Sequence, residues 1–369
     1  MPEKVHIMSV VWYKVLPPVF GGQKGVAYFN EALGKVANLV CVCSKNNTPE
    51  AAGSYKVYNR LPVSKAQIFN AIVLYKLIRF ARQHNITHVM VEHTFHALAA
   101  LLLRYLGNCT IIFHVHNIEY QRLKNLGKWY WRGVYFLEAL CYKVGSEFLF
   151  KSHEDQQEVC RFFNVDPRRC FIVPFGITPS TPAYETPLVK ATIKAKHGID
   201  NNDALLLFTG SPGYPPNQKA VADLYQYLLP LLPPGYTIII TGASTSHFSF
   251  EDKPNFILAG TVPDLQEYYT AADVFINPVD TGGGVQTKTL EAIAHHLNVV
   301  CWQNKTNGID PLVVGKKLFT AVPENWSDFL LKIETAMECK EPTPASFYAY
   351  HSFDRHVRLL ADRIKKQNA

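Results

Sequence analysis

The chain has 369 residues, of which 48% are hydrophobic and 18% charged, and its formal net charge is +7. This length exceeds what one hydrophobic core usually serves, so it predicts two domains. The composition is typical of a globular protein that folds without stabilising disulfides or metal ions. The Lys and Arg residues are scattered rather than gathered into one run. The excess charge therefore favours anionic partners but does not choose among phosphorylated ligands, anionic membranes and nucleic acid.

The cysteines and the apolar stretches bear on the compartment. The eight cysteines lie mostly in apolar runs and form no CxxC pair, which predicts buried thiols in a reducing compartment rather than a disulfide framework or a zinc site. The stretch MPEKVHIMSVVWYKVLPP lacks the apolar core of a secretory signal. The longest apolar stretches, such as FHALAALLLRYL, fall short of the roughly 20 residues that span a bilayer. We therefore expect a cytoplasmic protein.

The first half of the chain alternates short apolar runs with segments of helical spacing. The run VHIMSVVWY is followed by a loop with a glycine pair, the helical segment GVAYFNEALGKVA and the run LVCVCS. The alternation continues with a helical segment over about 65–83, the run THVMVEH, the helical segment FHALAALLLRYL and the run CTIIFHVHN. Repeated strand, loop, helix and strand predict an α/β domain with a doubly wound parallel sheet and helices on both faces.

The second half repeats this pattern after a break. The segment TPSTPAYETP follows FIVPFGI, is dense in Pro and Thr, and predicts an interdomain linker. Strand-like runs then recur at ALLLFTG, YTIIITG, NFILAGTV, DVFINPV and NVVCW, with helical segments between them, and FDRHVRLLADRIKK has the amphipathic spacing of a closing helix. We predict an N-terminal domain over 1–178, a C-terminal domain over 179–350 and a closing helix over 351–369.

Three consecutive glycines follow the strand-like run DVFINPV and precede a helix predicted to begin near Thr287: Gly282, Gly283 and Gly284. A helix start presents free N–H groups and a partial positive charge, and bare backbone lets an anionic ligand approach closely. Lys288 and Glu291 are three residues apart and share one helix face, where the cation suits phosphate oxygens and the carboxylate suits sugar hydroxyls. An ordinary glycine-rich loop beside an exposed Lys and Glu remains the alternative.

Two common nucleotide-binding patterns are missing from the sequence. No GxGxxG follows the first strand-like run, and no GxxxxGK[ST] occurs anywhere. Their absence argues against a dinucleotide oxidoreductase and a P-loop NTPase.

The run DVFINPVDTGGGVQTKTLEAIAHHLNVV resembles the donor-binding signature of retaining, nucleotide-sugar-dependent glycosyltransferases of family four. Further stretches agree with that family in order and spacing: LPPVFGGQKGVAYFNEAL, HVHNIEY, FIVPFGI, FTGSPGYPPNQKAV and GTVPDLQEYYTAADVF. The resemblance covers nearly the whole chain and implies the GT-B fold, in which two Rossmann-like domains face a central cleft. It also implies transfer of a sugar from a nucleoside diphosphate sugar to a glycan or lipid-linked acceptor, as in polysaccharide biosynthesis.

In the first domain the resemblance carries over to four residues. Gly21 and Gly22 match the glycine loop that closes over the donor diphosphate, and the alternative is a plain turn between strand and helix. His116 matches a histidine near the donor sugar, although a lone histidine is often structural. Glu119 faces either the acceptor or solvent.

In the second domain the resemblance carries over mainly to a loop and a helix. Gly210, Ser211 and Asn217 lie where the family wraps a loop round the diphosphate, and Asn217 is alternatively a helix N-cap. Val262 matches a loop whose backbone faces the nucleotide base. Lys288 and Glu291 match the phosphate and ribose positions.

The chain also departs from the family pattern. Gly283 stands where many members have a sugar-facing glutamate, Gln286 stands where a glycine-rich subgroup has Arg, and Ser211 stands where an Arg is common. Either Lys219 or Lys24 could supply the missing charge. After the site helix, His296 takes the place of a glycine in a left-handed C-cap, which histidine tolerates at a cost, and Asn298 takes the place of a proline.

The expected mechanism places the strongest stabilisation at the departing phosphate. The helix N-terminus, backbone N–H groups and Lys288 supply it without a metal or other cofactor, and the sequence has no DxD pair. The resemblance implies retention through front-face attack on the donor, with His116 and Lys288 as catalytic residues. Two other readings remain open: a non-hydrolysing nucleotide-sugar epimerase of the same fold, and a non-catalytic nucleotide-sugar binder. No basic stripe or recognised motif indicates nucleic-acid binding.

The segment QRLKNLGKWYWRGVYF, residues 121–136, interleaves basic and aromatic residues. This pattern fits a peripheral contact with the inner face of a membrane, where a lipid-linked acceptor would be met. It equally fits a helix that packs its aromatic face into the core and leaves its cations solvated.

Overall fold

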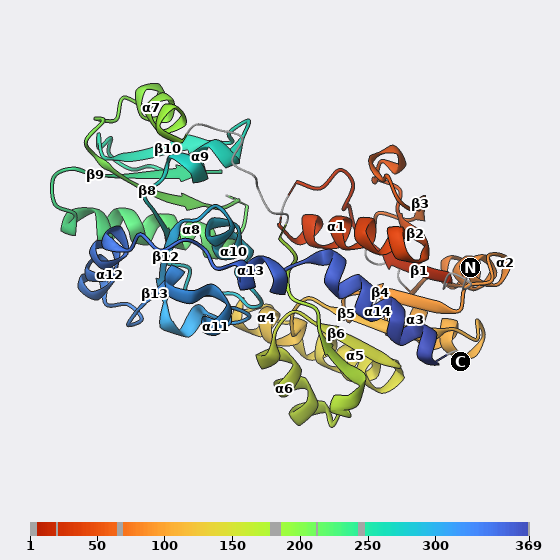
Figure 1. The fold of residues 1–369 in the computed structure, drawn as a ribbon. Coiled ribbons are helices and arrows are strands. Elements are labelled where there is room, and N and C mark those ends of the chain that lie inside the picture. The colour runs from red at the N-terminus through yellow and green to blue at the C-terminus, as the bar shows by residue number, and fades with distance from the viewer. Residues whose placement is uncertain are drawn as a thin grey trace. The chain divides into compact units, whose positions relative to one another are not determined.

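The structure, a computed structural model, describes residues 6–19, 21–64, 69–177, 186–211, 213–242 and 248–367. The chain divides into two compact units (Figure 1). Unit 1 comprises Met1–Gly176, Gly283–Val285 and His351–Ala369, and unit 2 comprises Ile177–Gly282 and Gln286–Tyr350. Each unit is built round a parallel sheet. The α/β fold class predicted from the alternating pattern is thereby confirmed.

Unit 1 contains a seven-stranded sheet in the order β3-β2-β1-β4-β5-β6-β7, and every pair of neighbouring strands is parallel. Its strands are β1 (His6–Val11), β2 (Asn38–Ser44), β3 (Lys56–Leu61), β4 (His88–Glu92), β5 (Thr110–Val115), β6 (Glu147–Phe150) and β7 (Cys170–Ile172). The central strands are buried along their length because helices cover both faces, which explains why they read as continuous apolar runs.

The helices of unit 1 connect successive strands. They are α1 (Gly21–Val36), α2 (Ala71–Gln83), α3 (Ala97–Tyr105), α4 (Glu119–Asn125), α5 (Trp131–Val144) and α6 (His153–Phe163). The helix predicted near the end of the chain is present as α14 (Phe353–Gln367), and it packs beside α1 in this unit (Figure 1). Val357, Leu360 and Ile364 of α14 share a core cluster with apolar residues of α1.

Unit 2 contains a six-stranded parallel sheet in the order β10-β9-β8-β11-β12-β13. Its strands are β8 (Ala204–Thr209), β9 (Tyr236–Thr241), β10 (Phe256–Gly260), β11 (Val274–Asn277), β12 (Asn298–Trp302) and β13 (Leu318–Ala321). Its helices are α7 (Thr186–Lys196), α8 (Pro215–Asp223), α9 (Leu265–Ala271), α10 (Thr287–Ala294), α11 (Pro311–Val314), α12 (Trp326–Glu338) and α13 (Ala345–Tyr350).

Three expected helices differ from the structure. The segment predicted over about 65–83 is helical only from Ala71, where Asn70 caps α2 through hydrogen bonds from the N–H groups of Ile72 and Val73. The helical segment expected between ALLLFTG and YTIIITG is α-helical only to Asp223 and continues as a π-helical turn at Leu224–Leu228. Residues 121–136 form parts of two helices, because Gly127 adopts a positive φ of 66° between α4 and α5.

The remaining sequence expectations concern the linker, the thiols and the membrane. Most of the predicted linker, residues 178–185, lies outside the described residues. All eight cysteines are free and six are buried, which confirms the prediction of buried thiols. Within the described ranges, no helix combines the length and hydropathy needed to cross a bilayer.

Candidate functional site

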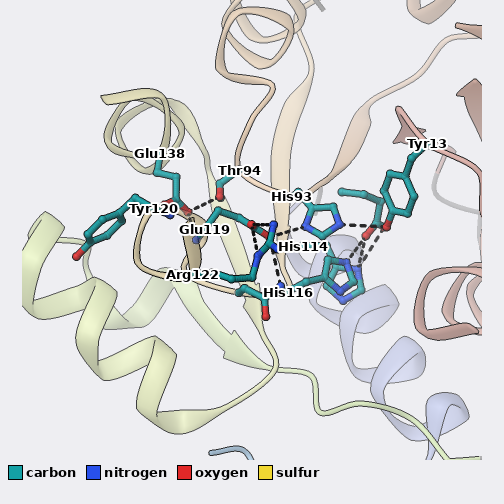
Figure 2. Close-up of polar contacts among 11 residues, drawn as sticks. Tyr13, His93, Thr94, His114, His116, Glu119, Tyr120, Arg122 and Glu138 are labelled. Atoms are coloured by element: carbon teal, nitrogen blue, oxygen red, sulfur yellow. Dashed lines mark hydrogen bonds and ion pairs between the residues drawn. The ribbon is translucent and has the colours of Figure 1, made fainter. Parts of the chain in front are cut away.

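A buried cluster of ionisable side chains lies where strands β4 and β5 of unit 1 end (Figure 2). Glu92 is the last residue of β4 and pairs in register with His114 of β5. One carboxylate oxygen of Glu92 lies 2.6 Å from Nε2 of His116 and 3.0 Å from Nδ1 of His114. His114 and His116 reach the same carboxylate because residues two apart in extended chain point to one side.

The charges in this cluster fix the protons on both imidazoles. Burial raises the pKa of Glu92, but His114 and His116 lower it more, and the net result lies well below the usual range. Burial lowers the pKa of both histidines. An ionised carboxylate beside two neutral imidazoles accepts a hydrogen bond from each, so His116 donates from Nε2 and keeps the lone pair of Nδ1.

Glu119 forms a second ion-paired group beside this cluster. Its carboxylate lies 3.3 Å from Nδ1 of His93 and 2.6 Å from the Arg122 guanidinium. Burial raises the pKa of Glu119, but His93 and Arg122 outweigh it and the pKa falls to about 2. The imidazole of His93 lies 4.6 Å from that of His116 between ring centroids, and its Nε2 is 3.1 Å from the Tyr13 hydroxyl. Glu119 is 1% exposed, so the interpretation that it faces solvent is wrong.

The carboxylate of Glu138, on α5, holds the first turn of α4. It accepts hydrogen bonds from the N–H groups of Glu119 and Tyr120 at 3.1 and 2.7 Å, and from the Thr94 hydroxyl at 2.6 Å (Figure 2). These bonds satisfy helix N–H groups that have no partner within the helix. Burial raises the pKa of Glu138 to about 7 against the effect of the three donors. Glu138 therefore fixes the position of the helix that carries Glu119 and Arg122.

Among the described residues, Glu92, His114 and His116 also form a set that could hold a metal ion, since their ligand atoms lie within 4.8 Å of one another. A bound cation would have to replace the protons that now join the two imidazoles to the carboxylate. The buried ammonium of Lys151 acts electrostatically on both Glu92 and His114, and burial lowers its pKa to about 8. A nearby cation and an already hydrogen-bonded carboxylate favour the proton-linked arrangement over a metal centre.

The glycine pair of unit 1 lies at the start of a helix. Gly21 is the first residue of α1, and a Cβ added to Gly22 would meet nothing within 4 Å. Lys24 lies in the same first turn. Among the described residues, the space beside the backbone of Gly22 at this helix start is therefore open.

Lys288 of unit 2 lies in the first turn of α10, where the sequence predicted a helix start. Its ammonium donates to Oδ1 of Asn217 at 2.7 Å and lies 4.2 Å from the ring centroid of Phe208. Burial lowers the pKa of Lys288 to about 7, although the Glu291 carboxylate acts in the opposite direction. This cation is held by a neutral amide and an aromatic face.

The structure corrects one interpretation of Asn217. Helix α8 begins at Pro215 and Tyr214 occupies the N-cap position, so Asn217 lies inside the first turn and is not the N-cap. Prolines suit the first turn of a helix because its N–H groups have no helical partner there. The Asn217 amide instead donates to the Ser211 carbonyl at 3.1 Å and accepts from Lys288. A Cβ on Gly210 would lie 2.7 Å from Asn217, so only glycine fits beside it.

Glu291 and Lys219 have different surroundings in unit 2. Oε2 of Glu291 accepts a hydrogen bond of 3.4 Å from the Tyr269 hydroxyl, and Tyr269 stacks on His295 with centroids 4.9 Å apart. Lys219 pairs with Asp223 and Asp280 at 2.6 and 2.7 Å. The structure thus brings Gly210, Asn217 and Lys288 together, whereas the charge of Lys219 is already matched by two carboxylates.

The remaining positions singled out in the sequence are the glycine run, His296 and Val262. Gly282 and Gly284 have φ values of 91° and 76°, which side-chain-bearing residues rarely adopt, and Gly283 is exposed. His296 has a φ of 65°, which confirms the left-handed conformation expected after this helix. Val262 lies partly exposed between β10 and α9.

Sequence reasoning missed most of the unit 1 cluster. Glu92, His93 and His114 belong to runs read only as strands, and Glu138 lies two residues beyond the segment 121–136 that was read for its aromatic residues. The signal was present: THVMVEH and CTIIFHVHN both end an apolar strand with ionisable residues. In a parallel sheet such strand ends lie at one edge, which is where ligands bind.

Two family models match the chain, one in each half. Residues 21–181 match the model described as Glycosyltransferase Family 4, and residues 203–338 match the model described as Glycosyl transferases group 1. The protein is a family-four-type glycosyltransferase with the GT-B fold. A search of curated proteins found no match.

Solved structures of similar fold cover almost the whole length of this glycosyltransferase. HepE of Anabaena, solved in complex with UDP and glucose, is 12% identical with a TM-score of 0.67 and 98% coverage of both chains. Sucrose-phosphate synthase from Thermosynechococcus elongatus has the same identity, TM-score and coverage. WaaG, a glycosyltransferase involved in lipopolysaccharide biosynthesis, is 15% identical with a TM-score of 0.64, covering 97% of this chain and 99% of its own.

Proposed function

We propose that this glycosyltransferase moves a sugar from a nucleoside diphosphate sugar to a glycan or lipid-linked acceptor, with retention and without a metal. The observation that carries the donor assignment is the environment of Lys288. Its ammonium has a neutral amide and an aromatic ring as contacts and lies at the start of α10. A diphosphate would place negative charge in direct contact with the ammonium, whose contacts among the described residues are neutral and on which Glu291 acts only electrostatically. The complex of HepE with UDP and glucose supports the same class of donor.

The groups around Lys288 suit the departing diphosphate better than the intact donor. Bond cleavage at the anomeric carbon increases the negative charge on the phosphate oxygen, so a fixed cation and a helix N-terminus stabilise the transition state more than the ground state. Asn217 holds the ammonium in place through its 2.7 Å hydrogen bond. This arrangement supports leaving-group stabilisation by the protein alone, and we expect full activity in the presence of a chelator.

Retention is supported by the state of the carboxylates in unit 1. A double displacement would need a carboxylate free to attack the anomeric carbon. Glu92, Glu119 and Glu138 are all buried and each accepts hydrogen bonds or ion pairs from neighbouring groups. Because these three carboxylates already bind neighbouring groups, none is free to act as the nucleophile. This favours front-face attack, in which the departing phosphate assists deprotonation of the acceptor.

His116 is the candidate for contact with a reacting sugar in unit 1. Glu92 holds its Nε2 proton, and the Nδ1 lone pair is then available to accept a hydrogen bond from a hydroxyl. The catalytic pair is accordingly Lys288 at the phosphate and His116 at a hydroxyl. Gly21, Gly22 and Gly282, Gly283 and Gly284 supply bare backbone for the donor.

A lipid-linked acceptor is supported by the surface of α4 and α5. Trp129 is 88% exposed and Phe136 is 71% exposed, so these two rings do not pack into the core as one reading of residues 121–136 required. Lys128 and Arg132 are exposed beside them. Exposed aromatic rings among cations are typical of proteins that rest on an anionic membrane interface.

The donor assignment is tested by thermal unfolding in the presence of UDP-, GDP-, ADP- and dTDP-sugars. A donor at a hundred times its dissociation constant adds about 2.7 kcal/mol of stability. The unfolding temperature should therefore be clearly higher with the correct nucleotide sugar than with the others. The stabilisation should disappear in Lys288→Met and persist in Lys219→Met. Equal stabilisation of both variants would contradict the assignment.

Product analysis with the stabilising donor then separates transfer from the alternatives. A transferase releases nucleoside diphosphate in proportion to glycosylated acceptor and retains the anomeric configuration. Conversion of the donor sugar without any acceptor would indicate an epimerase, and binding without turnover over a broad acceptor panel would indicate a non-catalytic binder.

The membrane contact is tested separately by sedimentation with vesicles of phosphatidylglycerol and phosphatidylcholine. The double variant Trp129→Ser/Phe136→Ser should bind these vesicles less tightly than the wild type. The matched control is Tyr105→Ser, because Tyr105 is 69% exposed at the end of α3. Unchanged binding of the double variant would contradict a membrane role for this surface.

A further inference from the structure

A groove of about 650 Å³ lies in unit 1 between α2 and the ends of strands β2 and β3. Its apolar lining consists of Val42, Leu61, Pro62, Val73, Leu77 and Phe80. Its polar lining consists of Lys45, Asn59, Arg60, Lys76, Arg79 and Gln83. Four of these side chains are cations and none is an acid.

The cations come from three elements that the fold brings together. Lys45 follows β2, Arg60 is the penultimate residue of β3, and Lys76 and Arg79 lie three residues apart on α2. Residues at this spacing share one face of a helix. The four charges therefore surround one groove although they are up to 34 positions apart in the sequence (from Lys45 to Arg79).

No carboxylate of the described residues forms an ion pair with any of these four cations. The guanidinium of Arg60 lies 5.2 Å from the ring centroid of Tyr58 and 5.8 Å from that of Phe80. Rings that cover the face of a guanidinium leave its N–H edge available to an anion. The groove thus contains four cations that no carboxylate of the described residues neutralises, and one of them, Arg60, lies against two aromatic rings.

A second groove, in unit 2, shows the opposite arrangement. It has a volume of about 370 Å³, and its lining includes both cations and acids, among them Lys317, Lys340, Asp273 and Glu341. The Lys317 ammonium donates to the His296 carbonyl at 2.7 Å and to Oδ1 of Asn298 at 3.0 Å. Its cation is satisfied within the protein, so this groove offers no comparable excess of positive charge.

We propose that the groove between α2 and β3 is a binding site for a phosphorylated ligand, with Arg60 and Arg79 holding the phosphate and Lys45 and Lys76 adding charge. Guanidinium groups present paired donors that match phosphate oxygens, and ammonium groups contribute point charge. The apolar floor accommodates the uncharged part of the ligand that carries the phosphate. This site is separate from Lys288 and does not depend on the proposed transfer reaction.

The test is a titration of the whole protein with inorganic phosphate at constant ionic strength, followed by nuclear magnetic resonance. Backbone amide signals of α2 report the groove, and those of α10 report the donor site, so the two are read separately. The α2 signals should shift with saturation. In Arg60→Gln/Arg79→Gln, the phosphate dissociation constant read from α2 should rise by about tenfold or more, because two charge-assisted pairs are lost.

Two further variants keep the result interpretable. Lys45→Gln/Lys76→Gln should weaken phosphate binding less than the arginine pair does, and it covers the case in which loss of Arg60 disturbs packing on Tyr58 and Phe80. The control Lys35→Gln/Lys56→Gln removes the same charge from exposed positions on α1 and at the opposite end of β3. If the control weakens binding as much as the groove variants, or if the α2 signals do not saturate, the proposal is overturned.

The source of the phosphate is read from the same α2 signals. A soluble phosphomonoester, glycerol phosphate, should displace inorganic phosphate if the natural ligand is a free phosphorylated molecule. Vesicles of phosphatidylglycerol should displace it, and phosphatidylcholine vesicles should not, if the ligand is a lipid headgroup. Either displacement supports the site, and failure of both ligands to displace inorganic phosphate overturns it.

Discussion

The two units surround their ionised side chains in different ways. In unit 1, Glu92 accepts hydrogen bonds from the imidazoles of His114 and His116, and Glu119 contacts His93 and pairs with Arg122. In unit 2, the Lys288 ammonium contacts the Asn217 amide and the face of Phe208. Unit 1 is therefore preorganised before any ligand arrives, because its protein groups complete one another. Unit 2 holds a cation whose full counter-charge would come from a bound anion.

Lys288→Met is expected to have the largest effect, and it tests this difference between the two units most directly. If an anionic leaving group completes the charge at this position, removal of the ammonium should reduce kcat by about 10²–10³-fold, the range found for the loss of one group that stabilises transition-state charge. The measurement is the initial rate of donor consumption with saturating acceptor. The variant should fold normally, since the lost ammonium was a partly buried charge and methionine fills similar space.

The matched control for this substitution is Lys219→Met. Lys219 is half-exposed and already pairs with Asp223 and Asp280, so its loss should change kcat by only a few fold. A rate loss in Lys219→Met equal to that in Lys288→Met would mean that the difference in charge balance has no bearing on catalysis.

A smaller effect is expected from Glu92→Gln in unit 1. The substitution leaves two buried imidazoles without their shared carboxylate and should lower the free energy of unfolding by about 1–3 kcal/mol. It should also change the proton position on His116, because the glutamine amide donates where the carboxylate accepted. Chemical denaturation measures the stability, and ¹⁵N shifts of the imidazole report the tautomer.

Two readouts distinguish positioning from packing at Glu92. If Glu92 positions His116, then kcat should fall while donor affinity at Lys288 stays unchanged. Glu92→Asp keeps the negative charge and should restore the Nε2-protonated imidazole in part. An unchanged ¹⁵N spectrum of His116 in Glu92→Gln would contradict the assigned proton position.

The remaining effects concern the dependence of stability on pH. Burial lowers the folded-state pKa of Lys288 to about 7, and in the unfolded chain the same group titrates near 10.4. Between these values the unfolded state binds more protons, so stability rises with pH, by at most about 1.4 kcal/mol per pH unit. Hydrogen exchange of strands β8 and β11 should show this rise in the wild type and less of it in Lys288→Met.

The corresponding change in unit 1 lies on the acid side. The pKa of Glu119 is lowered to about 2, so its contribution to stability is complete above its unfolded-state pKa of about 4.3 and is lost as the pH falls towards 2. The stability difference between the wild type and Glu119→Gln, read by exchange of β4 and β5, should shrink over that range. A difference that stays constant would mean that Glu119 is not ion-paired as described.

The fold was predictable because each element has a local signal. Parallel strands buried on both faces read as apolar runs, and the helices between them have helical spacing, so the alternation could be recognised without long-range information. The start of α10 at Thr287 was predicted for the same reason, since glycines precede it and Lys288 and Glu291 follow at helical spacing. Boundaries set by caps were less predictable, as Asn70 and Tyr214 show.

The partners of the site residues were not predictable because they depend on strand register and loop packing. Glu92 meets His116 across 24 positions of sequence, and Lys288 meets Asn217 across 71. The residues of HVHNIEY and their immediate neighbours give no sign that a carboxylate lies on the neighbouring strand. The alternative interpretation of Asn217 as an N-cap is wrong because two prolines place the helix start earlier, and its amide oxygen accepts a hydrogen bond from Lys288 instead.

Helix α14 has a consequence for how the chain folds during synthesis. Its apolar residues complete a core that α1 and the first sheet leave open, yet α14 is made roughly 300 residues after α1. At about 5–20 residues per second, the nascent first unit would wait some tens of seconds with that apolar surface uncovered. Proteins that recognise exposed hydrophobic chain would therefore have their longest access to the face of α1 against which α14 packs, and a deletion of α14 would make that exposure permanent.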